Sequence, residues 1–277
     1  MKKIISSFLI LLAFNISAED FRKRAHHLAT EKISSTESSL KAELEFGRGL
    51  AARILGLYPL VQNKKLQNYV NKLGAGVANM VGRPELQFHF AVINTMDVNA
   101  YACPGGYIFL TKGLMGILEN EAQLVGVLGH EIAHVNEKHV IKKLKIKGED
   151  ESALNALGAI VGGATNSFRV ALQTITQEGM KVLFEEGLSN SEELDSDKLA
   201  LSTMEALGYK VESYKYMLEN LKVASLKSRA QVVSKTHPKV QDRIKQVQDF
   251  VNAELKQNTQ PKTQITNFDR FKSYVQL

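Results

Sequence analysis

Apolar residues recur every three or four positions over most of this chain, the spacing of helices with one buried face. The pattern predicts helices over residues 40–57, 65–80, 111–118, 172–184, 191–208, 212–223 and 238–255. Gly208 is a suitable C-terminal cap for the helix predicted over residues 191–208, and Pro238 is suited to the first turn of the helix predicted over residues 238–255. The chain is therefore expected to be predominantly helical.

Between the second and third of these ranges, the pattern changes to the alternation typical of strands. Apolar residues occupy every second position of residues 86–92, which predicts a half-buried strand. Two further extended runs, 98–103 and 107–110, flank the turn Pro104-Gly105-Gly106. The fold class expected from both patterns is α+β, with one small sheet among the helices.

A further helical pattern, residues 121–139, places polar side chains in an apolar setting. Asn120 and Gln123 stand in capping-box positions, so its start is well marked. Residues four apart share one face of a helix, so His130 and His134 can bind one metal ion, and Glu131 lies beside them. A surface helix with two solvated histidines is the alternative. His139 should lie on the opposite face and should not be a ligand.

A catalytic zinc ion needs three protein ligands, so one must come from elsewhere in the chain. The extended metzincin motif would place a histidine where Val140 stands, which excludes that class. Glu193 is the best candidate, because Asp197 follows it on the same helical face and can hydrogen-bond a ligating imidazole. Glu192 and Asp195 point to other faces. An acidic surface turn favoured by the helix dipole is the alternative.

The first residues have the pattern of a secretory signal peptide. Lys2 and Lys3 precede an apolar run, and small residues lead to Ala18 before acidic positions. We expect residues 1–18 to be a cleaved signal, with an uncleaved anchor as the alternative. Export implies an oxidising compartment, but the single cysteine, Cys103, can form no internal disulfide. Cys103 is expected to be a small buried residue.

Composition fits one globular domain. The chain has 277 residues, of which 44% are hydrophobic and 23% charged, so residues 19–255 are assigned to one domain and residues 256–277 to a polar tail. The formal net charge of +6 includes Lys2 and Lys3, and no basic stripe is interleaved with aromatic residues, so no nucleic-acid partner is expected.

Two segments bear on contact with a membrane. The lysines of residues 138–147 suit a solvated helix end, with contact to anionic lipid headgroups as the alternative. The segment of residues 154–167 is rich in Ala and Gly and is too short to cross a bilayer. Its composition suits a flap, a membrane-touching segment or a loosely packed helix.

An ordered series of motifs over residues 46–247 resembles the family of zinc metallopeptidases that includes HtpX, BepA and the mitochondrial Oma protease. The motifs are Asn99-Ala100-Tyr101, Pro104-Gly105-Gly106-Tyr107, His130-Glu131-Ile132-Ala133-His134, Glu193-Leu194-Asp195-Ser196-Asp197, and Thr236-His237-Pro238 followed by Arg243. The resemblance implies a zincin-like metallopeptidase domain whose small β-sheet packs beside the metal-binding helix. It also implies one zinc ion, with His130, His134 and Glu193 as ligands and Asp197 in support.

The same resemblance implies roles for His237 and Arg243. The histidine is expected near the metal, as a transition-state donor or an auto-inhibitory ligand, with the arginine nearby. From the residues alone, a histidine at a helix start is more often a cap. Cys103 replaces the aliphatic residue that usually precedes the Pro-Gly-Gly motif, a change expected to affect packing only.

These inferences predict an exported zinc metalloendopeptidase of the periplasm of a diderm bacterium. Glu131 would act as the general base and His237 or Arg243 would stabilise the oxyanion. The expected substrates are polypeptides, among them misfolded envelope proteins. One alternative is a metal-stabilised, chaperone-like binder that assists envelope assembly with little proteolysis, and another is a structural zinc site. The oligomeric state stays open.

Overall fold

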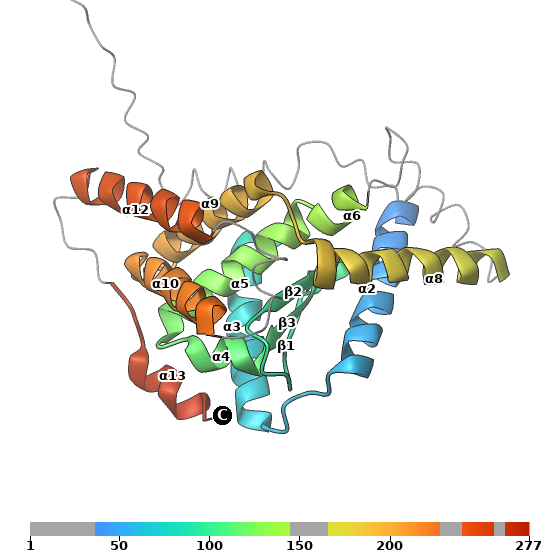
Figure 1. The fold of residues 1–277 in the computed structure, drawn as a ribbon, viewed down its shortest axis with the longest axis horizontal. Helices are drawn as coiled ribbons and strands as arrows, with labels where there is room; N and C mark the ends of the chain where they lie inside the picture. The colour runs from blue at the N-terminus through green and yellow to red at the C-terminus, as the bar shows by residue number, and fades with distance from the viewer. Residues whose placement is uncertain (1–36, 145–165, 228–239, 258–263, 277) are drawn as a thin grey trace, which may run out of the picture.

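The computed structural model describes residues 37–144, 166–227, 240–257 and 264–276 (Figure 1). The expected signal peptide, residue 237 and nearly all of residues 154–167 lie outside these ranges. Among the described residues, no helix combines the length and apolar character needed to cross a membrane.

Helices surround one small sheet, so the predicted α+β, predominantly helical fold class is confirmed. The helices are α2 (Glu37–Leu57), α3 (Lys64–Val81), α4 (Lys112–Ile117), α5 (Glu121–Asn136), α6 (His139–Lys143), α8 (Asn166–Lys181), α9 (Asn190–Ala206), α10 (Glu212–Lys227), α12 (Val240–Gln257) and α13 (Phe268–Tyr274). A π-helical turn, Val182–Glu186, continues α8. The predicted helix over 172–184 therefore begins earlier, at Asn166.

The sheet has three strands in the order β1-β3-β2, with bounds β1 (His89–Ile93), β2 (Ala100–Cys103) and β3 (Tyr107–Thr111). β3 pairs in parallel with β1 and antiparallel with β2, where Tyr101 stands opposite Phe109. The turn between β2 and β3 needs positive φ at Gly105 and Gly106, which glycine adopts readily. β2 is thus an edge strand within the described sheet.

Alternate residues of the strands face two parts of the core. Ala100 and Ala102 face the larger part with α3, α5 and α10, whereas Tyr101 and Cys103 face a second part with α2. Cys103 is buried and free, as expected from its apolar surroundings. α5 lies between the sheet and the helices α9, α10 and α12 (Figure 1).

Two glycines of α5 permit close approach of its neighbours. A Cβ at Gly129 would lie only 3.2 Å from Ala200 Cα in α9, and one at Gly126 would overlap the ring of Tyr214 in α10. Because the helices can approach this closely, polar side chains from α9 and α10 reach the next residue of α5, His130.

The two ends of α5 differ in how well the sequence predicted them. Asn120 caps the start as expected, because its Oδ1 accepts a hydrogen bond from Gln123 N at 3.0 Å. The predicted extension to His139 is wrong. α5 ends at Asn136, Lys138 adopts the left-handed conformation with φ 54°, and His139 opens α6.

A buried cluster of charges fixes the turn after α5. Arg83 donates two hydrogen bonds to Glu43 of α2, at 2.6 and 3.1 Å, and a third to Glu85 at 2.7 Å. Lys138 Nζ lies 3.4 Å from Glu43 Oε2. The lysine that the sequence placed on a solvated helix end is therefore mostly buried, and its ion pair with α2 holds the turn.

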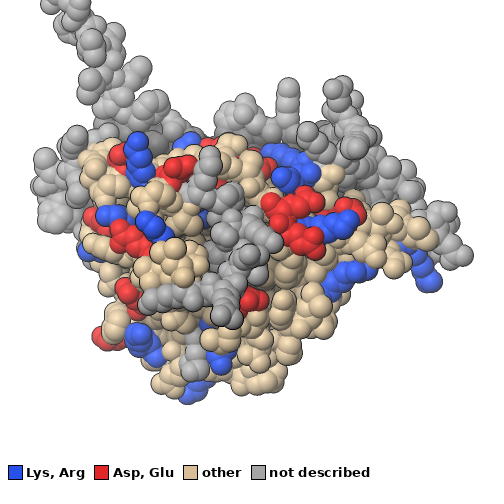
Figure 2. All heavy atoms as spheres, in the orientation of Figure 1, with Lys and Arg blue, Asp and Glu red and all other residues tan. Residues whose placement is uncertain are grey.

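The charged surface residues are mixed in sign. On the face shown in Figure 2, the described Lys and Arg side chains lie among Asp and Glu side chains rather than in a separate patch. Several of them form pairs along one helix, such as Lys181 with Glu178 and Lys198 with Asp195.

Glu121, in the first turn of α5, is fully buried and joins three distant segments. Its carboxylate accepts hydrogen bonds from Tyr69 at 2.8 Å, Tyr209 at 2.6 Å, Asn267 at 2.8 Å and Arg270 Nε at 2.6 Å. Burial raises the pKa of Glu121, but these four donors, Arg270 first, together bring it below its usual value.

The Glu121 contacts fasten α13 to the metal-binding helix. Phe271 of α13 is also buried in the larger part of the core. The sequence assigned these residues to a polar tail, whereas in the structure α13 packs against the start of α5.

We predict that Glu121→Gln lowers the free energy of unfolding by about 1–3 kcal/mol at pH 7, because a buried hydrogen-bonded charge is lost. The folded pKa of Glu121 is lower than the unfolded pKa, so its stabilisation is present above the unfolded pKa and is lost as the pH falls through the folded pKa. Urea titrations should show the difference narrowing below about pH 4.3. Glu178→Gln, in an exposed pair, is the control; equal midpoints for both variants would contradict the role of Glu121.

Candidate metal centre and active site

Three buried side chains from two helices converge on one point. His130 and His134 come from α5, and Glu193 comes from the first turn of α9. The two Nε2 atoms lie 2.9 Å apart, and each lies 3.5 Å from an oxygen of Glu193. All three side chains are buried. The structure therefore brings together the three residues that the sequence proposed as ligands.

The donor set fits a zinc ion. Two imidazole nitrogens and one carboxylate oxygen are usual ligands of catalytic zinc, at about 2.0–2.2 Å from the ion. Tetrahedral geometry then separates donor atoms by roughly 3.3–3.5 Å. The separations of 2.9 and 3.5 Å between these donors are close to that range, and three ligands leave the fourth corner for water.

Asp197 supports the first imidazole from one turn further along α9. Its Oδ1 lies 2.9 Å from His130 Nδ1 and accepts a hydrogen bond from Tyr214 Oη at 2.7 Å. A carboxylate at Nδ1 keeps the proton on that nitrogen and leaves Nε2 available to a metal. The position of Asp197 is the one expected from its spacing with Glu193.

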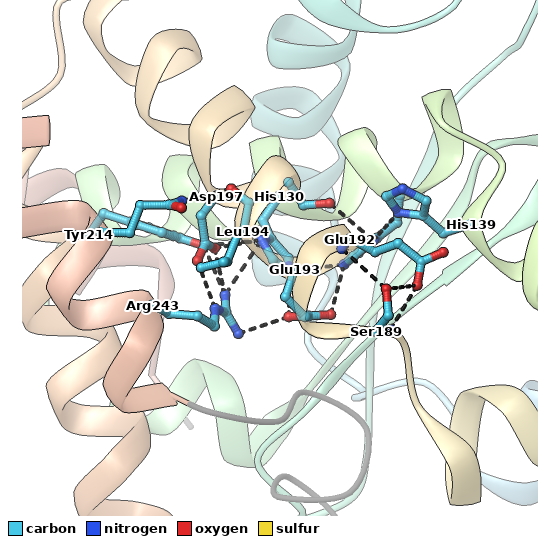
Figure 3. A network of polar contacts seen from close by, with 12 residues as sticks. His130, His139, Ser189, Glu192, Glu193, Leu194, Asp197, Tyr214 and Arg243 are labelled. Carbon is cyan, nitrogen blue, oxygen red and sulfur yellow. Dashed lines mark hydrogen bonds and ion pairs between the residues drawn. The ribbon is translucent and has the colours of Figure 1, made fainter.

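Arg243 of α12 links the two carboxylates of α9 (Figure 3). Its Nε and Nη2 donate to the two oxygens of Asp197 at 2.8 and 2.7 Å, and its Nη1 lies 3.0 Å from Glu193 Oε2. The arginine is thus near the metal site, where the resemblance placed it. Its guanidinium is engaged with carboxylates here, and its contact with an oxyanion stays a prediction.

The buried charged groups of the site shift the pKa values of Asp197 and His130. Burial raises the pKa of Asp197, but Arg243 and His130 bring it down to about 2, so the group is a carboxylate at neutral pH. Burial and Arg243 lower the pKa of His130, but Asp197 and Glu193 outweigh them and raise it to about 9. The site therefore favours positive charge at the imidazole nitrogens, which a bound cation supplies.

Glu131 lies between two hollows. One is lined by Val98, Asn99, Ala100, Leu114, Val127, His130, Tyr214, Met217, Leu221 and Arg243, and the other by Ala100, Ala102, His134, Val140, Val182, Leu183, Gly187 and Leu188. Glu131 borders both. This residue, next to the donor His130 on α5, therefore lines both of the spaces beside the three donors.

The structure corrects the position of His139. The sequence placed it on the face opposite the metal ligands, but its Nδ1 lies 2.8 Å from His134 Nδ1. The helix ends before this residue, so the helical spacing used for the prediction does not apply. His139 is not one of the three converging donors.

Two acidic residues near the site lie where the sequence predicted, and two residues that contact the imidazoles were not predicted. Glu192 forms a capping box with Ser189, and Asp195 is exposed, so both point away from the donors. Sequence reasoning missed Tyr214 and Ser196, which contact the imidazoles at 3.2 Å. Ser196 had a usable signal, because it stands three residues after Glu193 on the same helix. Tyr214 had none.

We predict that Asp197→Asn weakens zinc binding by about 10- to 100-fold, because the amide is a poorer acceptor for His130 Nδ1–H. Competition with a fluorescent chelator measures the affinity. Asp195→Asn, on the same helix with a side chain 63% exposed, is the matched control. An unchanged affinity for Asp197→Asn would show that this carboxylate does not support the ligand.

Comparison with known proteins identifies the family. The model of "Peptidase family M48" matches residues 64–251, a range that contains the donors, Glu131, Asp197 and Arg243. The chain is 25% identical over 261 residues to the beta-barrel assembly-enhancing protease of Escherichia coli (strain K12), covering 91% of this chain and 52% of that protein.

Two other relatives carry protease names. The metalloprotease YcaL of Escherichia coli (strain K12) is 26% identical over 220 residues, which are 79% of this chain and 83% of that protein. The mitochondrial metalloendopeptidase OMA1 of Schizosaccharomyces pombe is 24% identical over 196 residues, which are 69% of this chain and 55% of that protein. This chain spans about half the length of the first relative. The family model covers well over half of this chain. The chain therefore belongs to peptidase family M48, a family of zinc metallopeptidases.

Proposed function

We propose that this protein is an exported zinc metalloendopeptidase that cleaves misfolded polypeptides in the periplasm of a diderm bacterium. The observation that carries the proposal is the convergence of His130, His134 and Glu193 around one point, with Glu131 on the same helix. The signal-like N-terminus supports export, and the relative named as a beta-barrel assembly-enhancing protease supports a role in envelope protein quality control.

Each side chain has a distinct part in peptide hydrolysis. Bound zinc would polarise the scissile carbonyl and lower the pKa of the attacking water. Glu131 takes a proton from that water and delivers it to the leaving amine. Asp197 and Arg243 hold His130 and Glu193 in place. His237, outside the described residues, and Arg243 stay the predicted oxyanion donors.

The edge strand β2 suggests how a polypeptide is bound. No described strand pairs with the outer side of β2. Residues of β2 line both hollows, and Glu131 borders each of them. An extended peptide can pair with such an edge through main-chain hydrogen bonds and place side chains in neighbouring pockets. Because the peptide must be extended, unfolded segments are the expected substrates.

The geometry also predicts the direction of the peptide. β2 runs from the hollow beside Asn99 towards the hollow beside Ala102. A peptide that pairs antiparallel to β2, the more stable arrangement, runs the opposite way. The residue after the scissile bond then enters the first hollow. Its lining by Leu114, Met217 and Leu221 favours an apolar side chain there.

Asn99 supplies a polar group at the same place. It is almost fully buried, and among the described residues its amide makes no hydrogen bond of good geometry, although its side chain interacts with the Tyr101 hydroxyl. Buried amides of this kind are rare without a partner. A peptide main chain bound along β2 would provide a donor and an acceptor for it.

We predict that Glu131→Gln keeps the fold and zinc content but lowers casein cleavage by at least about 100-fold, because the amide cannot accept the proton. Glu137→Gln, one helical turn beyond His134, is the control and should cleave normally. The purified proteins are assayed before and after chelation, with zinc added back. Persistent cleavage by Glu131→Gln would refute the proposed function.

The same variant tests the chaperone-like alternative. Apolar hollows can hold a polypeptide without cutting it, and this binding does not need Glu131. If Glu131→Gln still corrects an envelope-assembly defect in cells lacking the wild-type protein, binding rather than hydrolysis is the main activity.

We predict that Met217→Phe narrows the first hollow and changes substrate preference. Cleavage before large aliphatic residues should fall by about 10-fold or more relative to cleavage before alanine, as is usual when a pocket loses room for one or two methylenes. Mass spectrometry of a digested peptide library measures the preference. Leu226→Phe, exposed on the same helix, is the control. An unchanged preference would show that this hollow does not receive the substrate.

A further inference from the structure

The second imidazole ligand needs a hydrogen-bond acceptor of its own. His134 Nε2 faces His130 and Glu193, so this nitrogen must be unprotonated to bind a cation. A neutral imidazole carries one proton, which then resides on Nδ1 and requires an acceptor in this buried site. For His130 the acceptor is the Asp197 carboxylate.

Two groups do meet His134 Nδ1. His139 Nδ1 lies 2.8 Å away and Ser196 Oγ lies 3.2 Å away. The shorter contact is to the imidazole, and the two rings meet at 65°, with centroids 5.0 Å apart. This edge-on arrangement allows an in-plane N–H of one ring to point at the in-plane lone pair of the other.

We infer that His139 is the positioning residue of the second zinc ligand: its Nδ1 accepts the Nδ1–H of His134 and thereby fixes the tautomer and orientation of that ring. The inference rests on the metal site of the proposed function. His139 would carry its own proton on Nε2. It does not touch the metal or the substrate in this role.

The turn after α5 is built so that His139 returns to His134. Lys138 adopts a left-handed conformation that residues other than glycine rarely adopt, and this interrupts the helix between Asn136 and His139. The ion pair of Lys138 Nζ with the buried Glu43 holds that conformation. His139 itself is only 4% exposed. An unfavourable backbone conformation that is held by buried contacts often marks a functional position.

The test compares variants that keep or remove an acceptor at this position. His139→Asn keeps an acceptor, because Asn Oδ1 stands close to the place of His Nδ1, whereas His139→Leu removes it. His139→Phe keeps a ring of similar size without an acceptor and replaces His139→Leu should that variant fail to fold. Ser196→Ala tests the longer contact. His89→Leu, at an exposed position in β1, is the control.

The main readout is the zinc dissociation constant, measured by chelator competition in the Glu131→Gln background. This measurement does not depend on proteolysis, so it separates failure of this inference from failure of the proposed function. Thermal unfolding of each metal-free protein gives the structural effect. His139→Leu and His139→Phe should bind zinc about 10- to 100-fold more weakly, and His139→Asn should bind within a few-fold of the parent.

Three results would overturn the inference. The first is unchanged zinc affinity in His139→Leu and His139→Phe. The second is an equal loss in His139→Asn, which would mean that the ring matters for packing rather than as an acceptor. The third is a loss confined to Ser196→Ala, which would assign the hydrogen bond to the serine.

Discussion

The close contact between α5 and α9 is the constraint on which the active site depends. Gly129 has no side chain, so Ala200 Cα can approach to a distance at which a Cβ, only 3.2 Å away, would be crowded. His130 is the next residue of α5, and Glu193 lies two turns before Ala200 on α9. The separation of the ligands is therefore fixed by backbone packing. Polar contacts then orient side chains that packing has already brought together.

Charge balance is the second requirement of this arrangement. Glu193 and Asp197 are buried, and burying carboxylates is unfavourable unless they are paired. Arg243 contacts both groups but carries only one positive charge. A divalent ion at the imidazoles compensates the remaining negative charge, including that of Glu131. Folding and metal binding should thus be coupled, and Arg243 should be what keeps α9 and α12 together when the metal leaves.

The sequence predicted the parts of the site that depend on local spacing. Helical periodicity placed His130 with His134, and Glu193 with Asp197, because each pair lies within one helix. The need for a third zinc ligand then pointed to Glu193, and the family resemblance implied the same residue. His139 was misplaced because its position depends on the turn at Lys138, which is held by Glu43, a residue far away in the sequence. Long-range contacts of this kind leave no periodic signal, so Tyr214 and the donors around Glu121 could not be predicted either.

The two histidine ligands are supported in different ways, and this difference connects the metal to the peptide-binding edge. Asp197 ties His130 to α9, α10 and α12 through Tyr214 and Arg243. His134 instead contacts His139, the first residue of α6. The following residue, Val140, lines the hollow beside Ala102. A peptide side chain in that hollow would contact the same short helix that carries His139. The second hollow and His134 thus share one short helix, whereas the first hollow borders the charged side of the site, with His130 and Arg243 in its lining.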